Sequence, residues 1–316
     1  MPETQGQETA APTILIESLC KDFGRVKAVR NLNLRVEKGE LFGLVGPDGA
    51  GKTTTIRMLA GILDPTSGNA FIDGISVRKD PDKVKEHLAY MPQRFGLYQD
   101  LTVIENLLFY ADLFGVPKKS RAHRIEELFA FSRLGPFSGR LAGALSGGMK
   151  QKLGLACALI HNPRVLLLDE PTNGVDPVSR RDFWKILQEL LMEGITILVS
   201  TAYLDEAERT TRTAFMRDGA IIELGTPKDL KTAVTGAMFE IIPSDVRQAK
   251  MALKISDKII DVNVFGDSLH VRLQDMDDEN LLREQLEEAG VGLKSLRRIA
   301  PAMEDVFLSV LSKQTG

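Results

Sequence analysis

A glycine-rich loop at residues 46–54 constrains the fold of this chain more than any other segment. It reads Gly-Pro-Asp-Gly-Ala-Gly-Lys-Thr-Thr, with the spacing of a phosphate-binding loop. Residues 41–46 form a short apolar run, and residues 53–63 carry apolar side chains at helical spacing. A strand, a glycine loop and a helix in this order are the context that the motif requires. The sequence therefore predicts an α/β nucleotide-binding domain.

The residue types of the loop suit a polyphosphate ligand. Glycines allow backbone N–H groups to converge on phosphate oxygens, and the N-terminus of the following helix adds partial positive charge. Lys52 is expected to reach the β- and γ-phosphates, and the Thr53 hydroxyl to bind Mg²⁺, which prefers oxygen ligands. The predicted nucleotide-binding residues of the loop are Gly46, Pro47, Asp48, Gly49, Ala50, Gly51, Lys52, Thr53 and Thr54.

Two acidic residues end a second apolar run. Residues 165–168 read Val-Leu-Leu-Leu and are followed by Asp169 and Glu170. Ligands of α/β folds bind at the carboxyl ends of the strands, so Asp169 is expected to hold Mg²⁺ and Glu170 to polarise an attacking water. The alternative interpretation is two solvated acids at a strand end, which the phosphate loop in the same chain makes less attractive.

Composition sets the broad class of the protein. A length of 316 residues favours one large domain with a smaller appendage. The net charge is only −3 and the basic residues are scattered, so we expect no nucleic-acid partner. Cys20 and Cys157 lie in apolar stretches without metal-type spacing, which favours buried thiols in a reducing compartment. The apolar runs are far shorter than the roughly 20 residues that cross a bilayer, so we expect no membrane span.

The residue patterns divide the chain into two domains after a polar, disordered tail at residues 1–12, which lacks the features of a signal peptide. Residues 13–232 carry a mixed α/β pattern that begins with antiparallel strands. A helical subdomain is inserted at about residues 94–160, where Gly-Pro and Gly-Gly pairs separate helical segments. Residues 233–316 follow a β-α-β-β-α-β order, which predicts a small ferredoxin-like α+β domain.

A second anion-binding motif precedes the acid-tipped run. Residues 145–151 read Leu-Ser-Gly-Gly-Met-Lys-Gln, in which Ser146 can cap a helix while Gly147 and Gly148 leave their N–H groups open. An ordinary helix start would read similarly. The order and spacing of the motifs nevertheless make this segment resemble the signature sequence of ABC ATPases.

The resemblance implies a P-loop NTPase fold, namely a RecA-like core with an antiparallel β-subdomain and the inserted helical subdomain. It also implies ATP as the nucleotide and a head-to-tail pair of ATPase subunits. In such a pair the signature of one subunit binds the nucleotide of the other through Ser146, Gly147, Gly148 and Gln151.

Other positions match the family as well. Phe23 resembles the aromatic residue that stacks on adenine, although an ordinary core aromatic would look the same in the sequence. Gln93 resembles the glutamine that links Mg²⁺ to the transporter, and residues 174–177 resemble the loop that crosses between subunits. The resemblance thus implies an ATPase with catalytic residues Lys52, Gln93 and Glu170 and Mg²⁺ ligands Thr53, Gln93 and Asp169.

One position departs from the family. After the apolar run at residues 195–200, the family places a histidine that holds the γ-phosphate, the glutamate and the water, but here Ala202 stands in its place. Loss of such a hydrogen bond commonly costs about 10²–10³-fold in rate, so we expect slow hydrolysis at this chain's own site. The alternative is that Glu170 suffices, or that the hydroxyl of Thr201 or Tyr203 substitutes.

Residues 13–230 as a whole resemble the ATP-binding subunits of ABC-2 type exporters, and residues 90–103 resemble bacterial multidrug-efflux ATPases of this class. The resemblance implies export of drugs, lipids or other compounds through a separate ABC-2 type membrane permease. The expected location is the cytoplasmic face of the plasma membrane, with a second ATPase subunit as partner. A homodimer and a heterodimer are both compatible, and Ala202 favours the heterodimer. Candidates for contact with the permease, or for an ordinary structural patch, are Phe95, Leu97 and Tyr98.

Two rival functions come from other classes. A soluble ABC ATPase that acts on ribosomes or DNA would carry two cassettes with a charged linker, or long coiled coils, and the sequence has neither. A regulatory nucleotide-binding module with little turnover is compatible with Ala202. Co-purification with a permease separates transport from both rivals, and an ATPase assay tests the second.

Overall fold

The computed structural model describes residues 11–94, 96–253, 258–274 and 279–315, so most of the predicted tail lies outside the described residues. The chain divides into two units, Met1–Leu224 and Gly225–Gly316. The boundary falls at residue 225 and not at the predicted residue 233. The reason is that helix α7 (Pro227–Thr232) packs against α10 (Met303–Thr315) within the second unit.

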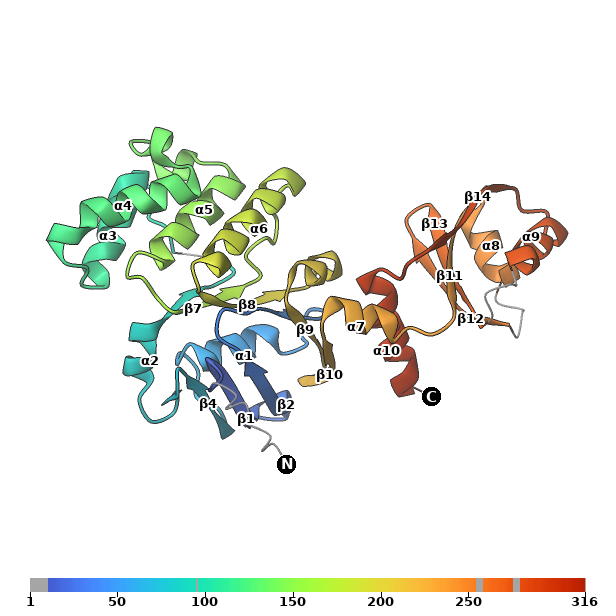
Figure 1. Ribbon diagram of the computed structural model, residues 1–316, viewed down its shortest axis with the longest axis horizontal. Helices are drawn as coiled ribbons and strands as arrows, with labels where there is room; N and C mark the ends of the chain where they lie inside the picture. The colour runs from blue at the N-terminus through green and yellow to red at the C-terminus, as the bar shows by residue number, and fades with distance from the viewer. Residues whose placement is uncertain (1–10, 95, 254–257, 275–278, 316) are drawn as a thin grey trace, which may run out of the picture. The chain divides into compact units, whose positions relative to one another are not determined.

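The first unit is built on a six-stranded sheet in the order β10-β9-β3-β8-β7-β6 (Figure 1). Three central strands are buried along their whole length: β3 (Leu41–Val45), β7 (Val165–Asp169) and β8 (Thr196–Thr201). They pair in parallel, as continuous apolar runs covered on both faces do. The outer strands are β6 (Leu88–Met91), β9 (Arg212–Arg217) and β10 (Ala220–Gly225).

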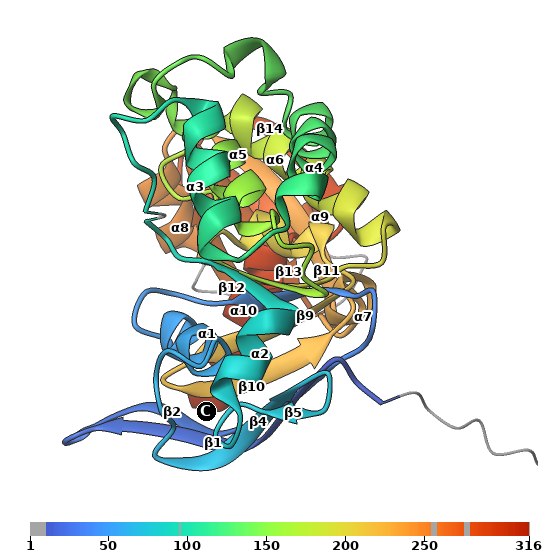
Figure 2. The ribbon, with the colours of Figure 1, turned by 90° about the vertical axis from the view of Figure 1, so that its left-hand side faces the viewer.

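Alternate residues of the central strands bury against two different layers. Leu166 and Leu168 of β7 belong to a core shared with helices, whereas Val165 and Leu167 belong to a core shared with the N-terminal strands. Figures 1 and 2 show the sheet between these layers. The helical layer consists of α3 (Val103–Leu113), α4 (Lys118–Ser132), α5 (Gly147–Ala158) and α6 (Pro177–Met192).

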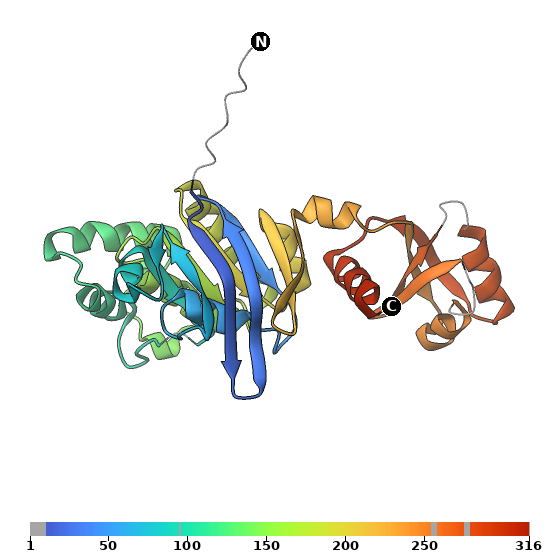
Figure 3. The same cartoon turned by 90° about the horizontal axis from the view of Figure 1, so that it is seen from below.

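The other layer confirms the predicted antiparallel β-subdomain. Its four-stranded sheet has the order β2-β1-β4-β5, and α1 (Lys52–Leu59) packs between it and the large sheet. The long hairpin of β1 and β2 is visible in Figure 3. The strands of this sheet are β1 (Ile14–Phe23), β2 (Val26–Val36), β4 (Ser67–Ile72) and β5 (Ile75–Ser76).

The helical subdomain is inserted between two neighbouring strands. Strands β6 and β7 pair in parallel, yet α3, α4 and α5 separate them in the sequence. Thr102 starts α3 with a capping box, in which its hydroxyl accepts from the N–H of Glu105 while the Glu105 carboxylate accepts from the N–H of Thr102. Short elements that the sequence patterns did not reveal are α2 (Pro81–His87), the 3₁₀ turns η1 (Gly135–Phe137), η2 (Ala142–Ala144) and η3 (Leu204–Arg209), and strand β6.

The second unit has the predicted β-α-β-β-α-β order, with the sheet order β12-β13-β11-β14. Its core lies between the sheet and helices α8 and α9. Helix α10 is linked to β13 by His270 Nδ1, which lies 3.0 Å from both carboxylate oxygens of the buried Asp305. The elements are β11 (Ala237–Pro243), α8 (Val246–Leu253), β12 (Ile259–Phe265), β13 (Ser268–Leu273), α9 (Glu279–Glu288) and β14 (Leu293–Ile299).

Two sequence expectations concern thiols and membrane spans. Both cysteines are free, but only Cys157 is fully buried, and its burial raises the pKa of the thiol. The prediction of a buried Cys20 is wrong, because its side chain is half-buried, with Sγ 3.1 Å from the N–H of Asn31.

In the described parts of the chain, each helix is too short or too polar to cross a bilayer.

An ion pair fastens the strand before the phosphate loop to its neighbour. Glu40, 5% exposed, directly precedes β3, and Arg212 begins β9. Nε and Nη2 of Arg212 donate to the two carboxylate oxygens of Glu40 at 2.6 and 2.9 Å. Such a two-point bond fixes the relative orientation of both side chains.

We expect Arg212→Ala to lower the free energy of unfolding by about 1–3 kcal/mol, because it leaves the Glu40 carboxylate buried without its partner. Urea unfolding followed by circular dichroism measures the change. The matched control is Lys85→Ala, which breaks an exposed ion pair with Asp82 and should cost at most about 1 kcal/mol. Equal losses of unfolding free energy in the two variants would contradict the larger contribution that we expect from the buried ion pair.

Candidate functional site

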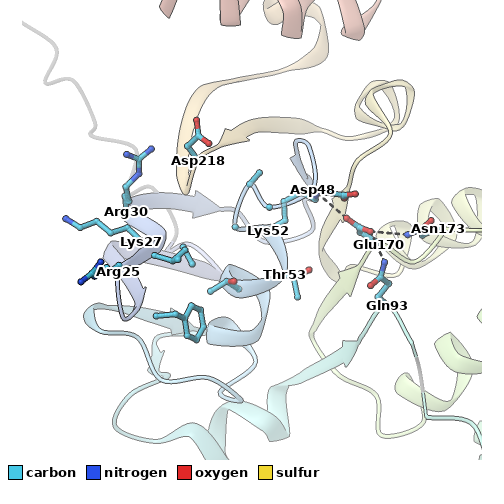
Figure 4. A pocket seen from close by; sticks show the side chains of 17 residues that line it. Arg25, Lys27, Arg30, Asp48, Lys52, Thr53, Gln93, Glu170, Asn173 and Asp218 are labelled. Atoms are coloured by element: carbon cyan, nitrogen blue, oxygen red, sulfur yellow. Dashed lines mark hydrogen bonds and ion pairs between the residues drawn. The ribbon is translucent and has the colours of Figure 1, made fainter.

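A cavity of about 840 Å³ opens at the carboxyl edge of the large sheet, where β3, β8 and β7 end side by side (Figure 4). In the sheet, Val45 of β3 lies opposite Thr201 of β8, and Ser200 lies opposite Asp169 of β7. The loops that follow β3 and β7 line this cavity, and the loop that follows β8 lines a smaller one beside Asp48 and Glu170. The hairpin of β1 and β2 forms another wall of the cavity.

The phosphate loop depends on glycine at a tightly packed position. Gly51 has φ +102°, and a Cβ atom there would lie 2.4 Å from the carbonyl oxygen of Ala28. A side chain would therefore meet both an unfavourable backbone conformation and a steric clash. Gly49 also has a positive φ, of +79°, but a Cβ atom there would have no neighbour within 4 Å. The loop thus needs glycine at residue 51 for space as well as for backbone conformation.

Lys52 lies at the centre of the loop and is 3% exposed. Its Nζ donates to the carbonyl oxygens of Gly46 at 2.7 Å and Pro47 at 3.1 Å. The same atom lies 3.2 Å from Oε1 of Glu170. A buried ammonium held in this way supplies concentrated positive charge where the loop's N–H groups converge, which suits phosphate oxygens.

The oxygen atoms around Asp169 fit a Mg²⁺ ion. Oδ1 of Asp169 accepts from the hydroxyls of Thr53 at 2.8 Å and Ser200 at 2.9 Å. Its Oδ2 is buried and has no hydrogen-bond partner within the described chain. The described residues contain no cluster of three or more His, Cys, Asp or Glu side chains that could hold a metal alone. Mg²⁺ binds with one or two carboxylates plus substrate phosphates, so such a cluster is not required.

Tyr90 of β6 lies behind this group. Burial raises the pKa of the Tyr90 phenol, and the negative charge of Asp169 raises it further, against the opposing effect of Arg57. The phenol therefore stays protonated at neutral pH and does not add a competing charge beside Asp169.

Glu170 is held in an unusual backbone conformation, with φ +48°. Its N–H lies 3.1 Å from both the carbonyl oxygen and the hydroxyl of Ser200. Its carboxylate accepts from Gln93 Nε2 at 3.1 Å and from Asn173 Nδ2 at 3.3 Å. Non-glycine residues with positive φ are uncommon and concentrate at functional sites, where surrounding contacts maintain them.

A smaller cavity of about 170 Å³ lies beside Ala202 and is also lined by Asp48, Glu170 and Asn173. The Thr201 hydroxyl is already engaged, since it donates to Oε2 of the buried Glu206 at 2.6 Å and accepts from the Tyr203 N–H at 3.0 Å. This argues against Thr201 as a substitute for the missing histidine, because its single proton is used.

Tyr203 has a different neighbour. The guanidinium of Arg180 lies 4.0 Å from the centre of the Tyr203 ring, a cation–π contact. Arg180 Nε also donates to Glu206 at 3.1 Å. The ring is thereby packed against the side chain of Arg180 on α6, while Tyr203 also lines the small cavity together with Glu170.

The signature residues form the start of α5. Ser146 is the N-cap, and its hydroxyl accepts from the Met149 N–H at 3.3 Å. A Cβ atom at Gly148 would lie 2.4 Å from the Ser179 side chain of α6, whereas one at Gly147 would have nothing within 4 Å. Gly148 therefore permits close helix packing, and Gly147 leaves the helix tip open. None of Ser146, Gly147, Gly148 and Gln151 lines the cavity of their own chain.

The loop predicted to cross between subunits caps the neighbouring helix. Asp176 is the N-cap of α6, and Oδ1 accepts from the N–H groups of Val178 at 3.1 Å and Ser179 at 3.0 Å. Hydrogen bonds from Ser179, through its side chain and then its backbone, lower the pKa of Asp176. The carboxylate is therefore charged at neutral pH and interacts favourably with the positive end of the α6 helix dipole.

The structure brings most predicted site residues to one cavity. Phe23 is 50% exposed at its mouth, which excludes the alternative of an ordinary core aromatic. Gly46 and Pro47 contribute through their carbonyl oxygens, and Asp169 lies behind Thr53. The other predicted residues that line the cavity are Asp48, Gly49, Ala50, Gly51, Lys52, Thr53, Thr54, Gln93 and Glu170.

Sequence reasoning missed a group of basic residues at the rim. Arg25, Lys27 and Arg30 extend from the β1–β2 hairpin along the same cavity (Figure 4). Their closeness in sequence to Phe23 was the available signal. Asn173 and Asp218 were also missed.

Of the predicted permease contacts, Phe95 lies outside the described residues, Leu97 packs partly against the helical core, and Tyr98 is exposed.

Comparison with known proteins agrees with this geometry. The family described as "ABC transporter" matches residues 29–173, and the "ATP-binding protein DrrA1-3-like, C-terminal domain" matches residues 225–311. The linearmycin resistance ATP-binding protein LnrL of Bacillus subtilis is 31% identical, over 94% of this chain and 97% of LnrL. The chain belongs to the ATP-binding proteins of ABC transporters. Its first unit is the ATP-binding, P-loop ATPase domain of that family.

Two further similarities concern the ABC fold and the length of the chain. The probable multidrug ABC transporter ATP-binding protein YbhF of Escherichia coli is 45% identical over 90% of this chain, which spans about half of the YbhF length (49%). The dimeric structure of a bacterial ABC transporter cassette covers 67% of this chain and 98% of its own, with a TM-score of 0.61 and 27% identity. The predicted P-loop NTPase fold is thereby confirmed.

We expect Gly51→Ala to weaken ATP binding by at least about tenfold, because the added methyl group forces the loop away from Ala28. Gly49→Ala is the matched control, since its residue also has a positive φ but open space around it. Isothermal titration calorimetry with ATP measures the affinities, and thermal melting checks folding. Equal weakening in both variants would show that backbone conformation alone matters.

Proposed function

We propose that this chain is the ATP-hydrolysing subunit of an ABC-2 type exporter, which moves drugs, lipids or other compounds through a separate permease. The supporting observation is one cavity in which the phosphate loop, the Thr53–Asp169 oxygen group and Glu170 converge. The names of two relatives agree with export: YbhF is a probable multidrug transporter protein, and LnrL is a linearmycin resistance protein.

In the proposed mechanism, each wall of the cavity has one task. Phe23 stacks on adenine, and the phosphate loop with Lys52 binds the β- and γ-phosphates. Thr53, Gln93 and Asp169 would hold Mg²⁺, which when bound draws electron density from the γ-phosphate and neutralises developing charge. Glu170 polarises the attacking water from the side opposite the leaving group.

The signature supports a head-to-tail pair. The open tip of α5, with Ser146 and Gly147, is absent from the cavity of its own chain, so its anion-binding groups are available to a partner's nucleotide. The γ-phosphate then favours the closed pair, because it is bound by both subunits. Hydrolysis removes this differential contact and the subunits separate, which drives the permease.

Ala202 supports a heterodimer. The pair would lie on the cytoplasmic face of the plasma membrane, because it acts on the proposed permease in that membrane. The small cavity beside Ala202 offers no donor from that residue, and Thr201 is engaged with Glu206. A second ATPase that retains the histidine would carry a competent site, completed by Ser146, Gly147, Gly148 and Gln151 of this chain. The site built on Lys52 of this chain would mainly hold ATP.

We expect Ala202→His to raise the steady-state kcat of the purified chain by about 10²-fold, since it restores a transition-state hydrogen bond. Phosphate release with Mg²⁺ and ATP measures the rate, and Glu170→Gln in each background sets the zero level. Full activity in the unmodified chain would overturn the slow-site proposal. Binding of ATP without any turnover would instead favour the regulatory-module alternative.

A second experiment tests the partners. Tagged chain purified from membranes of its native cells should carry a permease and a second, histidine-bearing ATPase. In that complex we expect Ser146→Arg to lower ATPase activity at least about tenfold and Lys52→Ala to lower it less than about twofold, because they damage the competent and the slow site, respectively. Equal losses would contradict the heterodimer, and recovery without any permease would contradict the transport function.

A further inference from the structure

One hydrogen bond to the Glu170 carboxylate comes from Asn173, a residue that has no role in the proposed mechanism so far. Asn173 Nδ2 donates to Oε2 of Glu170 at 3.3 Å, and the Asn173 N–H donates to the Glu170 carbonyl oxygen at 3.1 Å. Figure 4 shows the Asn173 amide directed at the carboxylate. The residue therefore acts on the group to which we assign the activation of water.

The other partners of this carboxylate have competing tasks. Lys52 Nζ lies 3.2 Å from Oε1, but it is also the proposed ligand of the β- and γ-phosphates. Gln93 Nε2 lies 3.1 Å from Oε2, but Gln93 is also a proposed Mg²⁺ ligand. A cation that neutralises phosphate interacts less strongly with a carboxylate, because the two anions share its charge. Within the described residues the Asn173 amide donates only to Glu170, so a nucleotide bound by the phosphate loop does not compete for this hydrogen bond.

The segment that carries Asn173 is anchored at Thr172 and closed into a turn. The Thr172 hydroxyl donates to Oε1 of Glu206 at 2.8 Å, and both residues are 1% exposed. After Asn173, the Val175 N–H donates to the Thr172 carbonyl oxygen at 3.1 Å and closes a turn. A side chain on a fixed segment loses little conformational freedom when it orients a neighbour, which suits a positioning role.

We propose that Asn173 is a positioning residue that orients the Glu170 carboxylate in place of the missing histidine. Asn173 and Ala202 line the same cavity of about 170 Å³ together with Glu170. A hydrogen-bond donor at residue 173 or at residue 202 would therefore reach the same carboxylate, that of Glu170. The inference rests on the proposed ATPase function, in which Glu170 polarises water.

The first test is Asn173→Ala in the purified chain. We expect kcat for phosphate release to fall about tenfold, as loss of a hydrogen bond to a charged group does. The Kd for ATP should change less than about twofold, because the affected group acts on the water and not on the nucleotide. The kcat of Asn173→Asp should fall further than that of Asn173→Ala, since the aspartate adds a second carboxylate beside Glu170. Asn33→Ala, which removes an exposed amide on β2, is the matched control and should keep the kcat.

The second test repeats Asn173→Ala in the Ala202→His background. Because both donors serve one carboxylate, the loss of kcat there should be less than about threefold. An unchanged kcat in the single variant, or equal losses in both backgrounds, would overturn the inference. If the wild-type chain binds ATP but releases no more phosphate than Glu170→Gln, the ATPase proposal itself fails and the positioning role falls with it.

Discussion

The alignment of three buried parallel strands is the constraint on which the site depends. Strands β3, β8 and β7 end at one edge of the sheet, and their ends carry the phosphate loop, the Ala202 loop and the Asp169–Glu170 pair. Each strand is buried on both faces, and alternate residues pack into two different cores. Moving a strand by one residue would exchange the side chains that fill the two cores and displace the polar groups at its end. The two cores on either side of the sheet therefore keep the chemical groups in place.

The buried charges at this edge of the sheet have partners, and one carboxylate oxygen is left for a ligand. Lys52 is balanced by two carbonyl oxygens and Glu170, and Oδ1 of Asp169 accepts two hydroxyl hydrogen bonds. Oδ2 of Asp169 is a buried carboxylate oxygen without a hydrogen-bond partner within the described residues, and it lies beside the Thr53 hydroxyl, where a Mg²⁺ ion would be needed. Buried polar atoms are normally satisfied, so an unsatisfied one beside a phosphate loop is informative.

Hydrogen-bond donors around the attacking water are concentrated on the Glu170 side of the site and lacking at Ala202. Four residues contact Glu170, namely Lys52, Gln93, Asn173 and Ser200. Ala202 supplies no side-chain donor, and the Thr201 hydroxyl already donates to Glu206. Such a site can bind nucleotide well and still turn it over slowly, because binding and water activation use different residues. This division agrees with a pair of unequal subunits, in which the signature of this chain serves the faster site.

The sequence by itself determined the elements and the chemistry that depend on local spacing. The phosphate loop, the acid-tipped strand, the signature and the order of the second unit are each encoded within a few neighbouring residues, so their patterns were legible without a structure. The basic rim of Arg25, Lys27 and Arg30, the use of the Thr201 hydroxyl, and the bond from Asn173 to Glu170 were decided by tertiary structure. The partners in the last two bonds are only five and three residues apart in the sequence. They meet because the packed strands fix the backbone conformation of the turns after β8 and β7, including the positive φ of Glu170, and no residue pattern states that conformation. The basic rim likewise depends on how the β1–β2 hairpin folds over the phosphate loop.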